Sequence, residues 1–195
     1  LKALYQIYDT VDASDPYTPT SSDETDSVGG TWPKANVIGK SIILTAGWGI
    51  GEAANTFDID SSYAAVGNLT STSGAGYNTY IIETNGDLYI NQVATGASDI
   101  AFITAPAGSI LNGNAGTCVF DATSGCNVVS GKTKLYASNN IGSSTSYLAS
   151  VVGNLEGKTI SGSVWIKNYG QLTAGGVTPS AGGVQSGGSI YVTAS

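Results

Sequence analysis

The chain has 195 residues, of which 41% are hydrophobic and 11% are charged, and seven basic residues face fourteen acidic ones for a formal charge of −7. The absence of histidine excludes a Ser-His-Asp triad, a Cys-His dyad and a His-ligated zinc site. Seven scattered lysines cannot coat a phosphate backbone, so we expect no nucleic-acid partner. No apolar run approaches the roughly 20 residues that a membrane-spanning helix needs, so we expect no membrane span.

Residues 1–35 differ in composition from the rest of the chain. We interpret them as an N-terminal capping or assembly segment with an acidic loop, and we expect its apolar part to cap an end of the fold or to pair with a neighbour by strand addition. Pro16 and Pro19 interrupt the pattern, the polar stretch 18–30 predicts an exposed loop, and the chain re-enters the fold at Trp32-Pro33. The acidic residues lack the spacing of a calcium-binding loop, which favours a solvated segment. The apolar positions of the assembly segment are Leu1, Leu4, Tyr5, Ile7, Tyr8 and Val11.

From residue 36 onward the sequence predicts short β-strands. Runs of β-branched and aromatic residues are bounded by Gly, Ser, Asn or Asp, which is typical of strands between turns. No window keeps a 3.6-residue apolar period over three turns, so we expect almost no helix. The clearest strand-like runs are 41–45, 87–90, 99–104, 163–166 and 189–193.

Short phrases also recur at long intervals. Asn36-Val37-Ile38 is echoed by Asn127-Val128-Val129, and the phrase 86–90 is echoed by 162–166. These echoes suggest a body, 36–195, made of two tandem copies at about 36–126 and 127–195.

Strand-and-turn repeats without helix favour an all-β solenoid, in which successive coils stack in parallel and bury a shared core. A coil of about 20 to 25 residues would give roughly seven coils. The alternative is an antiparallel β-sandwich, which has similar short strands but no reason for a long-range internal echo.

Cys118 and Cys126 enclose seven residues, and Ser124-Gly125 offers a turn between them. A hairpin of this length brings two Cα atoms within bridging range, so we expect a disulfide rather than two buried thiols. A disulfide implies an oxidising compartment, and we expect a secreted or cell-surface protein. The tripeptide Asn68-Leu69-Thr70 matches a glycosylation acceptor, which agrees weakly with that location.

Several phrases resemble the filamentous-haemagglutinin-type adhesins of bacteria. They are 99–105 followed by 108–114, then 134–144, and finally 188–194. The resemblance covers about residues 36–195 and implies a right-handed parallel β-helix that is exported and displayed on the cell surface. Residues 1–35 have no counterpart in that family, and the cysteine pair is unusual for it.

Two features suggest chemistry. Asp58 and Asp60 flank Ile59, so on a strand both carboxylates point to one side, as an acid pair for glycoside cleavage or a calcium site requires. We favour two solvated carboxylates on an outer face, and we expect no cofactor apart from that candidate calcium site. Gly47 to Gly51 outlines a glycine-rich loop but lacks the Lys-Ser/Thr of a phosphate cradle, which favours a corner of the coil.

The chain also has eleven tyrosines and three tryptophans. They either form a carbohydrate-stacking surface or, as we favour for Tyr89, Trp165 and Tyr191, a ladder on one face of the stack. The sequence thus predicts a non-enzymatic extracellular structural or adhesive protein, either a module of a surface adhesin or the subunit of a filament, which associates with itself or with neighbouring modules. The alternative is a carbohydrate-binding or polysaccharide-degrading protein on the same scaffold, with a surface glycan as its partner. A trimeric tail-fibre segment is a third hypothesis.

Overall fold

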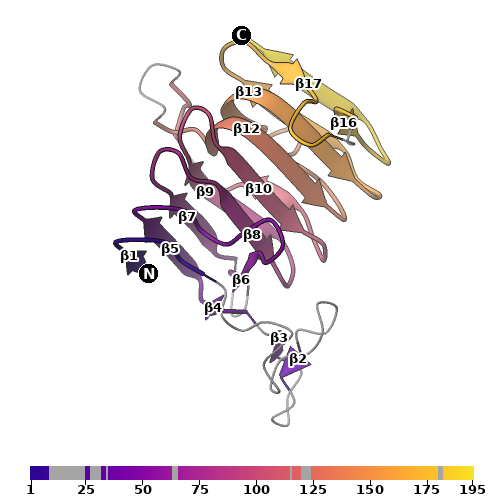
Figure 1. Ribbon diagram of the computed structural model, residues 1–195. Helices are drawn as coiled ribbons and strands as arrows, with labels where there is room; N and C mark the ends of the chain where they lie inside the picture. The colour runs from indigo at the N-terminus through magenta and orange to yellow at the C-terminus, as the bar shows by residue number, and fades with distance from the viewer. Residues whose placement is uncertain are drawn as a thin grey trace.

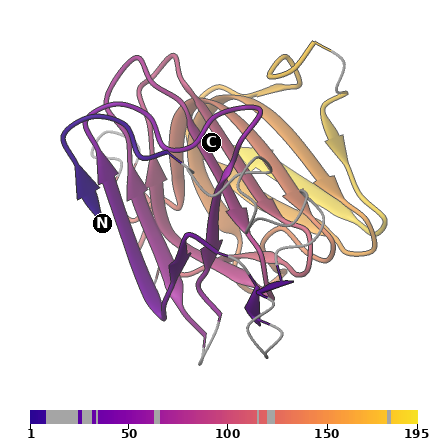
Figure 2. The same ribbon diagram turned by 60° about the horizontal axis from the view of Figure 1, so that its bottom comes forward.

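The computed structural model describes residues 1–8, 25–26, 32–33, 35–62, 66–114, 116–119, 124–179 and 182–195. In these residues the fold is all-β, without a helix, as predicted. A 15-stranded sheet runs through almost the whole chain and curls into a half-barrel, while β2 (Thr25–Asp26) and β3 (Trp32–Pro33) form a separate antiparallel pair (Figures 1 and 2).

The strands of the large sheet follow the chain from β1, beside the N-terminus, to β17, near the C-terminus (Figure 1). They are β1 (Lys2–Ala3), β4 (Val37–Ile38), β5 (Ser41–Ala46), β6 (Phe57–Asp60), β7 (Asn68–Thr72), β8 (Thr79–Glu83), β9 (Leu88–Ala94), β10 (Ile100–Ala105), β11 (Ile110–Asn112), β12 (Val128–Ala137), β13 (Leu148–Thr159), β14 (Val164–Asn168), β15 (Thr173–Ala174), β16 (Val184–Gln185) and β17 (Ile190–Ala194).

Each of the five clearest predicted runs falls on a strand: β5, β9, β10, β14 and β17. These runs are rich in Ile, Val, Leu and aromatic residues, which fit a pleated and half-buried surface. The longest strands, β12 and β13, were not predicted, because Gly131 and Gly153 interrupt each apolar pattern in the middle.

Every strand pair in the large sheet is parallel, so the antiparallel sandwich is wrong for the described residues. Many partners lie 22 positions apart in the sequence, as in Leu88 with Ile110, Ile81 with Ile103 and Val128 with Ser150. This spacing is within the expected length of one coil. We call the stretch of chain between one strand and its paired neighbour, commonly 22 residues, a rung.

The strands form two rows. The first row contains β1, β5, β7, β9 and β11, then the early parts of β12 and β13, and finally β14 and β17. The second row contains β4, β6, β8, β10, the later parts of β12 and β13, and finally β15 and β16. In β12 and β13 one strand therefore serves both rows.

Side chains that stack on one another from rung to rung form the core. Leu88, Ile110, Ile141 and Val164 occupy one such column in the first row, and all four are fully buried. Burying a side chain of this size contributes about 1.5–3 kcal/mol, so the stacked columns are the main source of stability.

The long-range echoes have two structural meanings. Leu88 and Val164 share a column, so the echo between 86–90 and 162–166 marks equivalent positions. Asn36 precedes β4 in the second row, whereas Asn127 precedes the part of β12 that pairs with β9 in the first row. The 91-residue echo therefore does not join positions of one column, and the division into two tandem copies stays a prediction.

The N-terminal segment joins the large sheet. Lys2 and Ala3 pair in parallel with Thr45 and Ala46 of β5, and Ile7 is buried opposite Ile50. A side chain at Gly47 would collide with the carbonyl oxygen of Leu4, so the glycine-rich turn is a site of close backbone packing. Of the predicted assembly residues, Val11 lies outside the described part of the chain, as does most of the acidic loop.

Candidate functional site

Side-chain oxygens hold successive rungs together at the starts of several strands. An Asn or Asp just before a strand, or just before the isolated bridge residue Ile141, accepts a hydrogen bond from the backbone N–H of the residue 22 or 23 positions later. Each bond satisfies a backbone donor at or close to the start of a strand. The pairs, from Oδ1 to N, are Asn36 with Asp58 (2.8 Å), Asn78 with Ile100 (2.8 Å), Asp87 with Ser109 (2.7 Å), Asn127 with Ala149 (2.8 Å) and Asn140 with Ser163 (2.9 Å).

This bonding gives the echo between Asn36 and Asn127 a local cause. Both residues stand one position before a strand and cap the next rung in the same way, although they lie in different rows. The signal available in the sequence was an Asn or Asp directly before an apolar strand.

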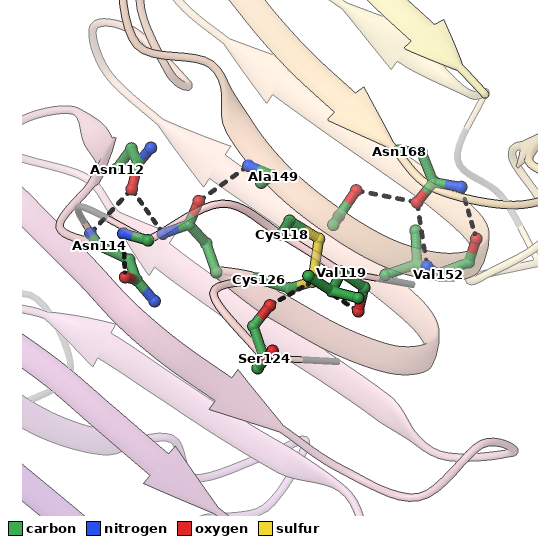
Figure 3. Close-up of a disulfide and its surroundings, with 12 residues drawn as sticks. Asn112, Asn114, Cys118, Val119, Ser124, Cys126, Ala149, Val152 and Asn168 are labelled. Atoms are coloured by element: carbon green, nitrogen blue, oxygen red, sulfur yellow. Dashed lines mark hydrogen bonds between the residues drawn. A yellow bond between two sulfur atoms is a disulfide. The ribbon is translucent and has the colours of Figure 1, made fainter. Parts of the chain in front are cut away.

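A disulfide-closed excursion leaves the sheet between β11 and β12 (Figure 3). Val93 pairs with Val128, 35 positions on, whereas Leu88 of the same strand pairs with Ile110, 22 positions on. The difference of 13 residues is the length of chain inserted into this rung. The extra residues lie between Asn112, the last residue of β11, and Val128, the first residue of β12.

A hydrogen-bonded neck closes the excursion at its base. The side-chain nitrogen Nδ2 of Asn127 donates to Oδ1 of Asn112 (2.8 Å) and to the carbonyl oxygen of Ile90 (2.7 Å). Oδ1 of Asn112 also accepts from the backbone N–H of Asn114 (2.8 Å), as Figure 3 shows. Because these bonds keep the two ends together, the insertion leaves the stacking of the rungs uninterrupted.

The predicted bridge between Cys118 and Cys126 is present, with the Cα atoms 4.4 Å apart. Both cysteines are buried, whereas Val119 beside the bridge is 46% exposed. The excursion is therefore a covalently closed loop that presents an apolar side chain to solvent.

Asp58 and Asp60 are not the solvated carboxylates that the sequence suggested. Asp58 is 9% exposed and Asp60 is fully buried. Oδ1 of Asp60 accepts bonds from the backbone N–H and the hydroxyl of Ser62, while its Oδ2 has no hydrogen-bond partner. Asp58 also accepts a hydrogen bond from the Thr56 hydroxyl (3.3 Å), and an alternation pattern alone does not reveal such contacts.

Glu83 is the second fully buried carboxyl group of this region. Its Oε1 accepts the backbone N–H of Ser61 (2.8 Å), and its Oε2 lies 2.5 Å from the Ser61 hydroxyl. The pKa of Glu83 is raised to about 8, chiefly by burial and with a smaller contribution from the charge of Asp60, although the hydrogen bonds from Ser61 act in the lowering direction. Glu83 is therefore largely uncharged at neutral pH and binds β8 to the turn after β6. No group of three or more His, Cys, Asp or Glu side chains among the described residues has a metal-binding arrangement.

Glu156 organises the loop after β15. Its carboxylate accepts the backbone N–H groups of Val177 and Thr178 (2.9 Å each) and the Thr178 hydroxyl (2.7 Å). Burial alone would raise the pKa of Glu156, but the bonds from Thr178 and Val177 and the charge of Lys134 outweigh burial and lower it. The hydrogen bonds from Val177 and Thr178 therefore stabilise the charged form of Glu156.

The aromatic ladder exists in part. The rings of Trp165 and Tyr191 stack at 3.8 Å between centroids. Tyr89 lies in the same column, but Leu111 is its neighbour on the next rung, so it does not touch Trp165. A second aromatic cluster lies where the N-terminal segment meets the glycine-rich turn. Trp48 stacks on Tyr77 at 5.5 Å and meets Tyr5 edge-on at 5.0 Å.

That second cluster is open to solvent. Tyr5 is 60% exposed, Trp48 42% and Tyr77 39%. The sequence alone does not point to this set, because its members come from three separate segments. The three rings form an exposed aromatic surface.

Two surface cavities lie along the later rungs. One cavity, with a volume of about 430 Å³, is lined by Gly131, Gly153 and Tyr169 among others, and Tyr169 is the one titratable residue in its lining. The other, of about 350 Å³, is lined by Lys134, Glu156 and Lys158 among others. Neither contains the two facing carboxylates of a glycoside hydrolase. Asn68 of the glycosylation tripeptide is exposed on β7, and its modification stays a prediction.

No helix of the described residues is long and apolar enough to cross a membrane. Comparison with known proteins adds no relative: no family model, no curated protein and no solved structure matches the chain.

Proposed function

We propose that this protein is a non-enzymatic extracellular structural or adhesive protein, built as a right-handed parallel β-solenoid. It would serve as a module of a cell-surface adhesin or as the subunit of an extracellular filament. The single observation that supports this proposal most strongly is the continuous parallel pairing from β1 to β17, in steps that are commonly 22 residues.

The protein would act by bearing mechanical load. A load along the stacking direction acts on many parallel ladders together with the Asn and Asp side-chain bonds between rungs. The buried columns resist separation of the rungs because separation exposes apolar surface.

The disulfide is compatible with an extracellular location. It closes the one excursion that interrupts the 22-residue spacing between β9 and β12, where an unrestrained loop would be exposed to proteases. Val119 beside the bridge is exposed and offers an apolar contact point.

Electron microscopy of the purified protein tests this function. Long regular fibres support the filament subunit, and isolated rods support the adhesin module. Compact globular particles would contradict both.

A second candidate is carbohydrate binding through the cluster of Tyr5, Trp48 and Tyr77, which is favoured by its exposed stacked rings. Glycan-array binding that is lost in Trp48→Ala would support it. Unchanged binding in that variant would assign the glycan to another surface.

A further inference from the structure

The solvent side of the second row carries a cavity with two lysines. Lys134 and Tyr136 on β12 and Lys158 on β13 alternate with buried residues, so they reach the solvent side of the sheet. Strand pairing places Lys158 beside Tyr136 on one side and beside Gln185 of β16 on the other. All four side chains line the cavity of about 350 Å³. Small-ligand pockets have volumes of roughly 300–1,000 Å³, so this cavity has room for one small ring-shaped group.

Positive charge exceeds negative charge in the lining of this cavity. Lys134 and Lys158 contribute two ammonium groups, and Glu156 is the one acidic residue of the lining. Glu156 is buried, and its carboxylate already accepts three hydrogen bonds, from Val177 and Thr178. The ammonium of Lys158 has neither a hydrogen bond nor an ion pair within the part of the chain that the structure describes. An anion that enters the cavity therefore meets a cation that no neighbouring carboxylate neutralises.

Lys134 is held in position beside the cavity. Its Nζ lies 5.5 Å from the centre of the Phe102 ring, which occupies the same register position on β10. Tyr80 of β8 continues this column, and its ring centre lies 6.0 Å from that of Phe102. A cation that already rests on a ring loses less freedom when it binds a ligand, so this contact prepares Lys134 for binding.

The side chains of the lining indicate the class of ligand. The chain has no arginine, so no planar fork is present for bidentate recognition, and each lysine acts as a point charge. Tyr136 adds the face of a ring and a hydroxyl group. Gln185 adds an amide whose Nε2 makes one long bond of 3.5 Å to the carbonyl oxygen of Gly182, so the amide is available to a ligand. This combination matches a small ring that carries hydroxyl groups and one negative charge.

We propose that this cavity binds one acidic sugar unit of an extracellular polysaccharide. Lys158 and Lys134 would hold its carboxylate or sulfate group, and Tyr136 and Gln185 would contact its ring and hydroxyl groups. The site is separate from the aromatic cluster around Trp48. This inference rests on the proposed adhesive function, for which it names the class of ligand.

Isothermal titration calorimetry at low salt tests the ligand class. The probes are trigalacturonate, which carries carboxylates, a heparin-derived tetrasaccharide, which also carries sulfates, and the methyl ester of trigalacturonate, which is neutral. We expect an acidic sugar to bind at least about tenfold more tightly than the neutral ester, because hydrogen bonds to charged groups are the stronger ones. Added salt should weaken this binding, since it screens exposed charges.

Two lysine variants test the location of the site. Lys158→Gln removes the ammonium that has no partner and should weaken binding of the acidic sugar by about tenfold or more. Lys167→Gln is the matched control and should bind like the wild type. It also removes one exposed lysine that lies against a ring, with Nζ 5.0 Å from the centre of Tyr169, but in the first row of strands. Lys134→Gln should weaken binding as well, and it decides the matter should Lys158→Gln fail to fold.

The proposal is supported by binding of either acidic sugar that is weakened in Lys158→Gln and retained in Lys167→Gln. The tighter of the two probes then identifies the charged group as a carboxylate or a sulfate. Equal weakening in both variants would indicate unspecific attraction and overturn the proposal, as would the absence of binding for both acidic probes. Binding of the methyl ester, of hexaglutamate or of inorganic sulfate as tightly as an acidic sugar would also overturn it.

Micrographs separate this inference from the proposed structural function. Isolated rods that bind no acidic sugar would refute the ligand and leave the structural function standing. Compact particles would refute the structural function, whereas binding that depends on Lys158 would still establish the site.

Discussion

Replacing Glu83 by glutamine should remove a large pH dependence of folding stability. Glu83 is fully buried, and its pKa is raised from 4.5 to about 8 in the folded protein. A carboxyl group whose pKa is raised by folding binds more protons in the folded than in the unfolded chain. Its contribution is therefore most favourable below pH 4.5 and is lost as the pH rises toward 8.

The magnitude follows from these two pKa values. One pKa unit corresponds to about 1.4 kcal/mol, so the cost of keeping Glu83 uncharged at pH 7 is on the order of 3 kcal/mol relative to pH 4. Glutamine is similar in shape, does not ionise and retains an oxygen that can accept the backbone N–H of Ser61. We therefore expect Glu83→Gln to be more stable than the wild type at pH 7, and the difference to shrink toward pH 4.

Urea unfolding at pH 4, 5, 6, 7 and 8 measures this difference. Glu52→Gln is the control, because it removes one carboxylate from an exposed position of the same half of the chain. Parallel stability profiles for the wild type and Glu83→Gln between pH 4 and 8 would refute the assignment of a buried, uncharged Glu83.

Four further outcomes are expected. Replacing both Cys118 and Cys126 by serine should lower the free energy of unfolding by about 2 kcal/mol and expose the excursion to limited proteolysis, with no change in far-ultraviolet circular dichroism; protease resistance equal to that of the wild type would contradict the excursion. Ile103→Ala, at a fully buried core position, should cost about 2–5 kcal/mol in chemical denaturation, and a cost below 1 kcal/mol would be incompatible with stacked rungs. Trp48→Ala should abolish any glycan binding while Trp165→Ala retains it, and the reverse result would move the platform to the other aromatic stack. Deletion of residues 1–11 should abolish assembly in electron micrographs, and unchanged filaments would show that this segment takes no part.

The sequence identified the strands whose side chains carry the clearest apolar signal. β5, β10 and β17 are short runs of β-branched and aromatic residues between turn formers, and such runs need a pleated surface wherever they pack. The disulfide was equally predictable from the sequence, because a hairpin of nine residues limits the distance between its ends.

The two rows were not predictable in the same way. β12 passes from one row to the other at Gly131, and only its pairing with β9 on one side and β10 on the other reveals the change. The inserted excursion between Asn112 and Asn127 also shifts the later spacing, so a search for a fixed repeat length finds echoes that do not share a column.

The burial of polar side chains was the other feature that the alternation of residues in the sequence could not predict. Alternation places Asp58 and Asp60 on one side of β6, but it does not say what covers that side. The burial of Asp60 and Glu83 depends on neighbouring turns such as the one at Ser61 and Ser62, whose positions follow from the stacking of complete rungs.

We propose that this chain is a stack of parallel rungs and that the stack acts as a scaffold. An experimental density map of the purified protein at a resolution that separates strands tests it most directly. We expect parallel strands about 4.8 Å apart, with Ile81, Ile103 and Leu135 superposed along one axis. Two facing antiparallel layers, with these three side chains unrelated by a common translation, would contradict it.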